Sequence, residues 1–215
     1  MSLTLYFHPL SSFCHKALIG LYDLDVPFDK RLVDLSDPVD RAAFVGLWPI
    51  GKFPVLQDEA QGLVLPESTI ILEYLDARCA SERRLIPRDP DQARDCRLRD
   101  RFFDLYIHLP MQKIVGDRIR PADQRDPYGV AQAKSQLETA YAIADGWVGA
   151  GPWALGDAFT MADCAAAPAL FYANKVAPFG ADRKNLAAYF ARLEARPSYA
   201  RVLEEAKPYL SHFPG

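Results

Sequence analysis

The residues best placed for chemistry lie between positions 11 and 16, in the sequence SSFCHK. This stretch follows the apolar run LTLYF and leads into ALIGLYDL, which has the apolar spacing of a helix. A cysteine-based redox protein places Cys-x-x-Cys at such a strand-to-helix junction. Here Ser11 stands at the position of the attacking cysteine, and only the second thiol, Cys14, remains. The loop therefore has the layout of a thiol site without its nucleophilic sulfur.

The composition excludes several classes of protein. Half of the 215 residues are hydrophobic, which is enough for a packed core and argues against disorder. The formal net charge of −3 predicts no general affinity for nucleic acid or for acidic membranes. No apolar run approaches the roughly 20 residues of a membrane helix, and the N-terminus lacks a signal-peptide pattern. We therefore expect a soluble, cytoplasmic protein.

Strands and helices are expected to alternate through the first 80 residues. The segments 3–7 and 26–35 are predicted as strands, and FPVLQ and LVL, separated by DEAQG, are predicted as a hairpin. Helical spacing is found at 13–24, in a short segment before the hairpin, and in STIILEYLDARC. The predicted order β-α-β-α-β-β-α describes a mixed sheet with helices on its faces.

The second part of the chain is predicted to be helical throughout. Residues 81–90 contain prolines among charges and are expected to form a linker, so that residues 91–215 make a separate all-helical domain. The candidate helices are 91–116, 128–149, 160–173, 184–195 and 198–207. Thr160 stands three residues before Asp163, which predicts a capping box at a helix start.

Four short stretches, in order between residues 11 and 164, resemble the soluble glutathione S-transferases. They are SSFC at the first strand-to-helix junction, WPIGKFPVL, LPESTIILEYL and GDAFTMADC. The resemblance implies a thioredoxin-like N-terminal domain, residues 1–80, joined to the all-α C-terminal domain, and it is closest to bacterial members with a serine-type loop of theta or zeta character. Trp48 replaces the usual asparagine and Lys16 stands where several serine-type relatives have arginine, which leaves the subclass open.

The resemblance also implies where glutathione, the co-substrate, would bind. The peptide bond between Phe53 and Pro54 is expected to be cis, and the Phe53 main chain would pair with the cysteinyl part of glutathione. Glu67 and Ser68 begin a helix, whose N-terminus attracts a carboxylate, so they would hold the γ-glutamyl group. Lys52 is a candidate for the glycyl carboxylate.

A protein whose nucleophile is the thiol of glutathione, and not a thiol of its own, needs a hydrogen-bond donor to stabilise the thiolate. A hydrogen bond to a charged group contributes about 1.5–3 kcal/mol, which lowers the thiol pKa by about 1–2 units from about 8.5. Ser11 is the preferred donor, because it occupies the position of the attacking cysteine. Ser12 and Tyr6 are the alternatives, and Cys14 is expected to be a packed thiol without redox activity.

The electrophile is expected to bind between the domains, against the predicted helix 91–116. A helical stripe there offers an apolar wall suited to a hydrophobic substrate, and Pro110 predicts a kink. The candidate wall residues are Phe103, Tyr106, Ile107, Pro110 and Met111. His8 and His15 flank the first loop without zinc spacing, His108 and His212 look isolated, and no metal is predicted.

The leading hypothesis is an enzyme that conjugates glutathione to a small hydrophobic electrophile, in a homodimer of the kind usual among similar proteins, and without nucleic-acid or membrane partners. Isomerase, ether-cleaving or peroxidase activity at the same site is an alternative. A non-catalytic binding or regulatory protein on the same scaffold is a third hypothesis. The cysteines Cys14, Cys79, Cys96 and Cys164 are expected to be reduced thiols.

Overall fold

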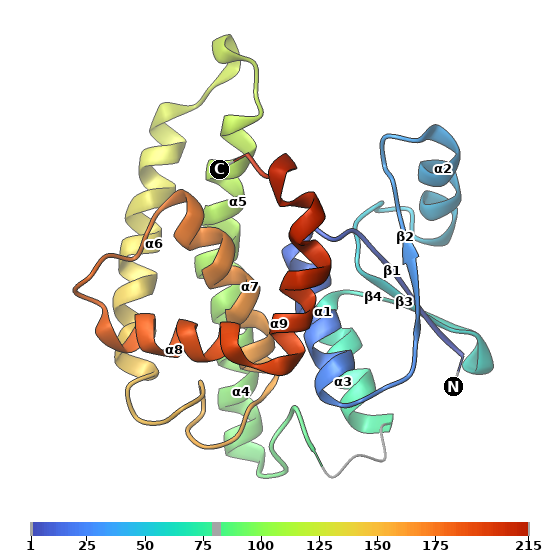
Figure 1. Ribbon diagram of the computed structural model, residues 1–215, viewed down its shortest axis with the longest axis horizontal. Coiled ribbons are helices and arrows are strands. Elements are labelled where there is room, and N and C mark those ends of the chain that lie inside the picture. Colours follow the sequence, from blue (N-terminus) through green and yellow to red (C-terminus); the bar gives the residue numbers. More distant parts are fainter. Residues whose placement is uncertain (1, 79–82, 215) are drawn as a thin grey trace.

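The computed structural model describes residues 2–78 and 83–214. One four-stranded mixed sheet lies at one side of the molecule, and its strands follow the order β2-β1-β3-β4 (Figure 1). Strand β1 pairs in parallel with β2 and antiparallel with β3, and β3 and β4 form the predicted hairpin. The strands are β1 (Leu3–Phe7), β2 (Asp29–Leu32), β3 (Val55–Asp58) and β4 (Leu63–Pro66).

Three helices complete this N-terminal part and confirm the predicted β-α-β-α-β-β-α order. They are α1 (Ser12–Asp23), α2 (Pro38–Leu47) and α3 (Ser68–Arg78), with a 3₁₀ turn, η1 (Glu59–Gln61), inside the hairpin. The predicted strand 26–35 is shorter than expected, because Pro27 has no N–H to give to a sheet ladder. The thioredoxin-like arrangement predicted from the sequence is confirmed.

The rest of the described chain is helical, as predicted. Its elements are α4 (Pro90–Phe102), η2 (Phe103–His108), α5 (Leu109–Arg118), η3 (Ala122–Gln124), α6 (Pro127–Trp147), α7 (Met161–Val176), α8 (Lys184–Ala195), α9 (Pro197–Ala206) and η4 (Lys207–His212). The division into residues 1–80, 81–90 and 91–215 stays a prediction, and Cys79 lies outside the described residues.

The helix expected over 91–116 is divided by a π-helical segment, η2. Pro110 stands near the start of α5 and has no N–H to donate to the carbonyl of Tyr106 one turn earlier. This missing hydrogen bond explains why the regular α-helix is interrupted just before Pro110, where the backbone forms the wider π turn instead. A π segment therefore stands where a kink was expected from Pro110, and its Asp104 and His108 side chains contact α1.

Helix α1 joins the two parts of the molecule. It packs on α3 on one side and on α7 and α9 on the other, and it lies between the sheet and the helical domain in Figure 1. Gly20 permits the close contact with α3, since a Cβ there would lie 2.1 Å from a methyl of Leu72. The N-terminus of α1 is thereby fixed at the boundary between the domains.

The capping box predicted at the start of α7 is confirmed. Asp163 is fully buried and its Oδ2 accepts hydrogen bonds from the main-chain N–H and the hydroxyl of Thr160, at 2.8 and 3.0 Å. Its Oδ1 accepts from the N–H of Ala154 and from the Tyr189 hydroxyl, both at 2.7 Å. Asp163 therefore fixes the loop before α7 and helix α8 at once, which is a structural role.

Candidate active site

Ser11 is the N-cap of α1. Its main chain has an extended conformation, and its Oγ accepts a hydrogen bond from the N–H of Cys14 at 3.3 Å. An N-cap hydroxyl that accepts from the helix keeps its own proton for another partner. Ser11 thus presents an O–H at the positive end of the helix dipole, where an anion is favoured.

A polar groove of about 190 Å³ lies beside this helix start. It contains all five residues that the sequence assigned to glutathione, and it also contains charged and apolar residues of the helical domain. Its lining residues are Phe13, Trp48, Lys52, Phe53, Pro54, Glu67, Ser68, Arg101, Asp104, Leu105 and Leu109. Two of these, Arg101 and Asp104, were missed in the sequence, because nothing in the local pattern of a charged helix shows which side chains meet another domain.

The backbone of the polar groove has two uncommon conformations. The peptide bond between Phe53 and Pro54 is cis, as expected. Glu67, just before α3, has a φ of +70°, a left-handed conformation that is uncommon for residues other than glycine. A left-handed residue such as Glu67 is often found at a functional site, where surrounding contacts hold its backbone in place.

An apolar cavity of about 440 Å³ adjoins the polar groove, and Phe53 lines both. Ser11 and Ser12 lie in its wall, and α5, α7 and the C-terminal segment supply most of the rest. The lining residues are His8, Leu10, Ser11, Ser12, Phe53, Met111, Gln112, Val115, Ile119, Tyr172, His212, Phe213 and Pro214. None of these described residues is an aspartate, glutamate, lysine or arginine, so the cavity suits an uncharged apolar molecule.

The other two candidate hydroxyls have partners of their own. Ser12 Oγ lies 3.2 Å from Nε2 of His108, so the histidine that looked isolated in the sequence touches the first loop. The Tyr6 hydroxyl donates to the side chain of Gln57 at 3.0 Å, and Tyr6 lines neither the polar groove nor the apolar cavity.

The expected histidines of the first loop also differ from one another. His15 is fully buried, and its Nε2 lies 2.6 Å from the Pro9 carbonyl. Burial lowers the pKa of His15 to about 4 and holds the ring neutral. Within the described residues, no group of acidic, histidine or cysteine side chains has the arrangement of a metal site.

A buried ionic cluster supports the polar groove from below. The Lys16 ammonium lies 2.6 Å from Asp100 and 2.7 Å from Asp104, and it donates to Thr69 Oγ1 at 2.8 Å. Arg101 also contacts Asp104. Burial raises the pKa of Asp104, and Lys16 opposes that rise. The cluster joins α1 and α3 to the helical domain, and its members Arg101 and Asp104 line the same groove as Glu67 and Ser68.

Cys14, at the position of the second cysteine of Cys-x-x-Cys, has an unreactive thiol in this environment. Cys14 is fully buried, and burial raises the pKa of its thiol to about 12. Cys96 and Cys164 are also buried free thiols. A thiol with so high a pKa supplies almost no thiolate at neutral pH.

The five residues expected in the electrophile wall fall in three places. Met111 lines the apolar cavity. Phe103 and Ile107 are fully buried in the core, because the π segment turns them toward α7 and the rest of the interior. Tyr106 and Pro110 line a third hollow on the opposite side of their helix, which we call the outer groove.

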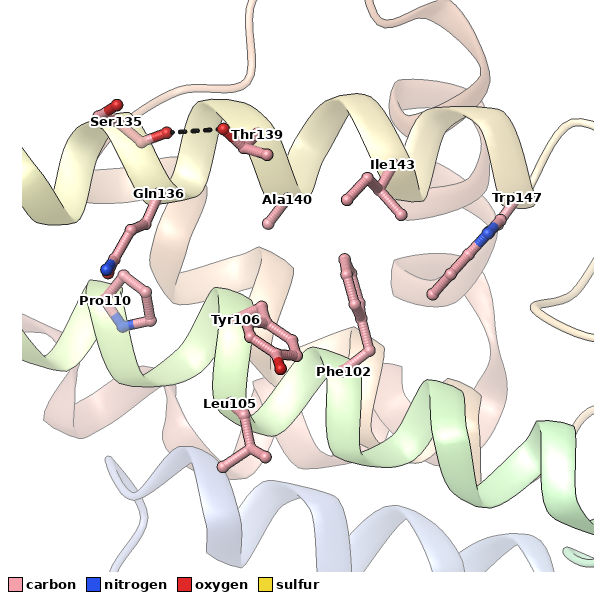
Figure 2. Close-up of a pocket in the computed structure, with 10 residues that line it drawn as sticks. All are labelled: Phe102, Leu105, Tyr106, Pro110, Ser135, Gln136, Thr139, Ala140, Ile143 and Trp147. Atoms are coloured by element: carbon pink, nitrogen blue, oxygen red, sulfur yellow. Dashed lines mark hydrogen bonds between the residues drawn. The ribbon is translucent and has the colours of Figure 1, made fainter.

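The outer groove, of about 630 Å³, runs between α6 and the helix formed by α4, η2 and α5. Figure 2 shows its apolar side chains, with Phe102 and Tyr106 on one helix and Ile143 and Trp147 on the other. Tyr106 is 58% exposed and Ile143 is 41% exposed. This groove is separate from the apolar cavity and has a different set of lining residues.

Two family models match the chain. The model described as glutathione S-transferase, N-terminal domain, matches residues 10–78, and the one described as glutathione S-transferase, C-terminal domain, matches residues 127–192. The glutathione S-transferase GstB of Escherichia coli strain K12 is 25% identical over 94% of this chain and 97% of its own length. A glutathione S-transferase-like protein, LUC7, of a Fusarium species is 30% identical over 73% of this chain and 69% of its own length.

Relatives with another name also match the chain, and solved structures agree with the fold. A stringent starvation protein A homologue of Coxiella burnetii is 27% identical over 99% of this chain and 97% of its own length. A glutathione S-transferase of Methylobacillus flagellatus, solved with glutathione bound, matches with a TM-score of 0.86 and 24% identity, over 94% of this chain and 98% of that one. That match supports the glutathione transferase fold.

The sheet, the helical domain and the grooves between them define a two-domain transferase fold. The chain belongs to the glutathione S-transferase family, and it is a glutathione transferase.

Proposed function

We propose that this protein binds glutathione in the polar groove. The observation that carries the proposal is that one groove gathers all five residues assigned to glutathione, next to the Ser11 hydroxyl. Glu67 and Ser68, at the start of α3, hold the γ-glutamyl group, with Asp104 and Arg101 of the helical domain close by. Lys52 pairs with the glycyl carboxylate.

The cysteinyl part of glutathione lies against the cis peptide unit of Phe53 in this proposal. An extended peptide that pairs with the Phe53 main chain places its side chain toward the wall that Phe53 shares with the apolar cavity. Ser11 and Ser12 lie in that wall. The thiol of glutathione is thereby directed to the N-terminus of α1.

Ser11 is the proposed donor to the thiolate. Its Oγ is fixed by the Cys14 N–H and keeps a proton to donate, whereas the Tyr6 hydroxyl is engaged with Gln57. One such bond contributes about 1.5–3 kcal/mol and lowers the thiol pKa by about 1–2 units. The helix terminus adds up to about 1 kcal/mol. Together these effects make the thiolate abundant at neutral pH.

The apolar cavity holds the electrophile in this proposal, with Met111, Val115, Ile119 and Phe213 as its wall. The thiolate sulfur forms a bond to an electrophilic carbon, and the leaving group departs with its electron pair. Two reactants held side by side lower the entropic part of the barrier. A hydrophobic electrophile fits because the cavity wall contains no carboxylate, ammonium or guanidinium group among its described residues.

The test is conjugation of glutathione to an activated aryl chloride at pH 6.5. Ser11→Ala is expected to lower kcat/KM about tenfold or more. The loss of one donor raises the pKa of the bound thiol by about 1–2 units, so less thiolate is present at pH 6.5. Ser36→Ala, an exposed serine outside the polar groove and the apolar cavity, serves as the control and is expected to behave as wild type. Equal activity of wild type and Ser11→Ala would contradict this role.

We further propose that the protein is a homodimer that buries the outer groove. The groove is largely apolar, and its lining includes the exposed side chains of Leu105, Tyr106 and Ile143. Exposed apolar surface of this kind usually marks a protein interface.

We also propose a cytoplasmic location. None of the described helices combines the length and the apolar character that crossing a membrane requires.

A binding or regulatory protein without catalysis is the second candidate, because one relative that spans nearly the whole chain, a stringent starvation protein A homologue, is not named a transferase. Isomerase, ether-cleaving and peroxidase activities would use the same glutathione groove with another second substrate. Calorimetric titration of glutathione separates the enzymes from the regulatory candidate, because every one of the enzymes must bind glutathione. Absence of binding would favour the regulatory candidate.

A further inference from the structure

His108 makes a buried contact between the two domains at the serine loop. Its Nε2 lies 3.2 Å from Ser12 Oγ, and its ring lies 4.0 Å, centroid to centroid, from that of Phe13. His108 is 1% exposed and Ser12 is 7% exposed. Phe13 lines the polar groove and Ser12 lines the apolar cavity, so His108 lies behind the junction of the two.

The π segment η2 places this histidine. Asp104 and His108 are four residues apart on η2, and their partners Lys16 and Ser12 are four residues apart on α1. Two polar contacts one turn apart therefore connect the same faces of two helices. π turns of this kind are often found at functional sites. The match in spacing fixes His108 against Ser12 rather than leaving it free to turn.

Its surroundings hold the imidazole of His108 neutral near pH 7. Burial, together with the nearby Lys16 ammonium, lowers the pKa of His108 to about 3. A neutral imidazole has one N–H donor and one acceptor nitrogen. A base with so low a pKa is unsuited to remove a proton, whereas its ring can still make a hydrogen bond.

We propose that His108 is a positioning residue, which holds the Ser12 hydroxyl so that it gives the glutathione thiolate a second donor beside Ser11. A thiolate in front of Ser12 only accepts, so the single Ser12 proton turns toward the sulfur. Nε2 of His108 then carries the ring proton and donates it to Ser12 Oγ. No proton is transferred, and no bond is made or broken in this arrangement.

This inference rests on the proposed function, and the experiment separates the two. The pKa of bound glutathione is measured from thiolate absorbance on wild type, Ser11→Ala, Ser12→Ala, His108→Phe and His108→Gln. Phenylalanine keeps the ring beside Phe13 and removes the hydrogen bond. The glutamine amide retains a donor near the place of Nε2.

His108→Phe is expected to raise the bound thiol pKa by about half a unit or more, since a complete donor to a charged group is worth about 1–2 units. His108→Gln is expected to stay near wild type. Ser12→Ala is expected to raise the pKa as well, and adding His108→Phe to it should change nothing further, because the two residues act as one unit.

Other results would overturn the inference in recognisable ways. A normal bound thiol pKa in His108→Phe, with a raised one in Ser11→Ala, would refute the role of His108 and leave the proposed function standing. Independent, additive effects of Ser12→Ala and His108→Phe would refute it too. A wild-type protein that binds glutathione without lowering its thiol pKa would refute both proposals. If His108→Phe does not fold, Ser12→Ala still decides, because an unshifted pKa of bound glutathione in Ser12→Ala would refute the inference.

Discussion

Replacing Lys16 with methionine should destabilise the protein strongly. The Lys16 side chain is 1% exposed, and its ammonium lies within 2.7 Å of two buried carboxylates, Asp100 and Asp104. Methionine fills a similar volume but leaves both carboxylates without that counter-charge. Removing one partner of a buried ion pair typically costs about 3–5 kcal/mol.

The expected change in melting temperature follows from chain length. For a chain of 150–250 residues, 1 kcal/mol corresponds to about 2–4 °C, so Lys16→Met should lower Tm by about 6–20 °C. Lys30→Met is the matched control, because Lys30 pairs with Glu205 at 2.9 Å on the surface. Surface pairs contribute about 0–1 kcal/mol, so the control should lose no more than about 4 °C.

The decrease in Tm caused by Lys16→Met should also depend on pH. Burial raises the folded-state pKa of Asp104 above its ordinary value, so its stabilising contribution is complete at low pH and is lost as pH rises through that pKa. Without Lys16 the pKa of Asp104 rises further, and the penalty grows at neutral pH. The Tm difference between wild type and Lys16→Met should therefore be smaller at pH 5 than at pH 7.

The assay is thermal unfolding followed by far-ultraviolet circular dichroism at both pH values. If Lys16→Met melts within about 2 °C of the surface control at pH 7, which corresponds to less than about 1 kcal/mol, the ionic cluster does not stabilise the interface between the domains. A pH dependence of the opposite sign would show that Asp104 is not the group that carries the penalty.

Three further predictions concern other parts of the molecule. Asp163→Ala should lower stability by several kcal/mol, roughly 3–5, because it leaves buried donors without an acceptor, whereas the exposed Asp91→Ala should have little effect in the same denaturant titration. Cys14 should resist alkylation at pH 8 in the folded protein, so wild type and Cys14→Ala should incorporate equal amounts of label. In urea the wild type should incorporate more, and unequal labelling without urea would contradict the burial of Cys14. Ile143→Glu should shift a dimer to monomer in sedimentation, whereas Ala142→Glu, exposed on the same helix outside the outer groove, should not; no shift would count against that interface.

Local patterns were enough to predict most of the fold. Apolar spacing predicts α8 at its observed bounds, Lys184–Ala195, and most other helix ends within two residues. The capping box at Thr160 and Asp163 is a local device, so its residues alone reveal it. The glutathione residues could be assigned because each belongs to a short stretch with a resemblance of its own.

Contacts between domains could not be predicted in the same way. Phe103 and Ile107 fit an apolar stripe equally well as pocket wall or as core, and only the packing against α7 assigns them to the core. His108 looked isolated in the sequence, because neither the π turn before Pro110 nor the contact with the first loop has a local sequence signal. His108 and Ser12 are 96 residues apart, and no local pattern reports that distance.

The central claim is that the Ser11 hydroxyl stabilises the thiolate of bound glutathione. The most direct measurement is titration of the bound thiol by its absorbance near 240 nm, in wild type and in Ser11→Ala. We predict a wild-type pKa lower than that of free glutathione by about a unit or more, and the loss of most of that shift in Ser11→Ala. An unshifted thiol in wild type, or a shift that survives intact in Ser11→Ala, would contradict the account.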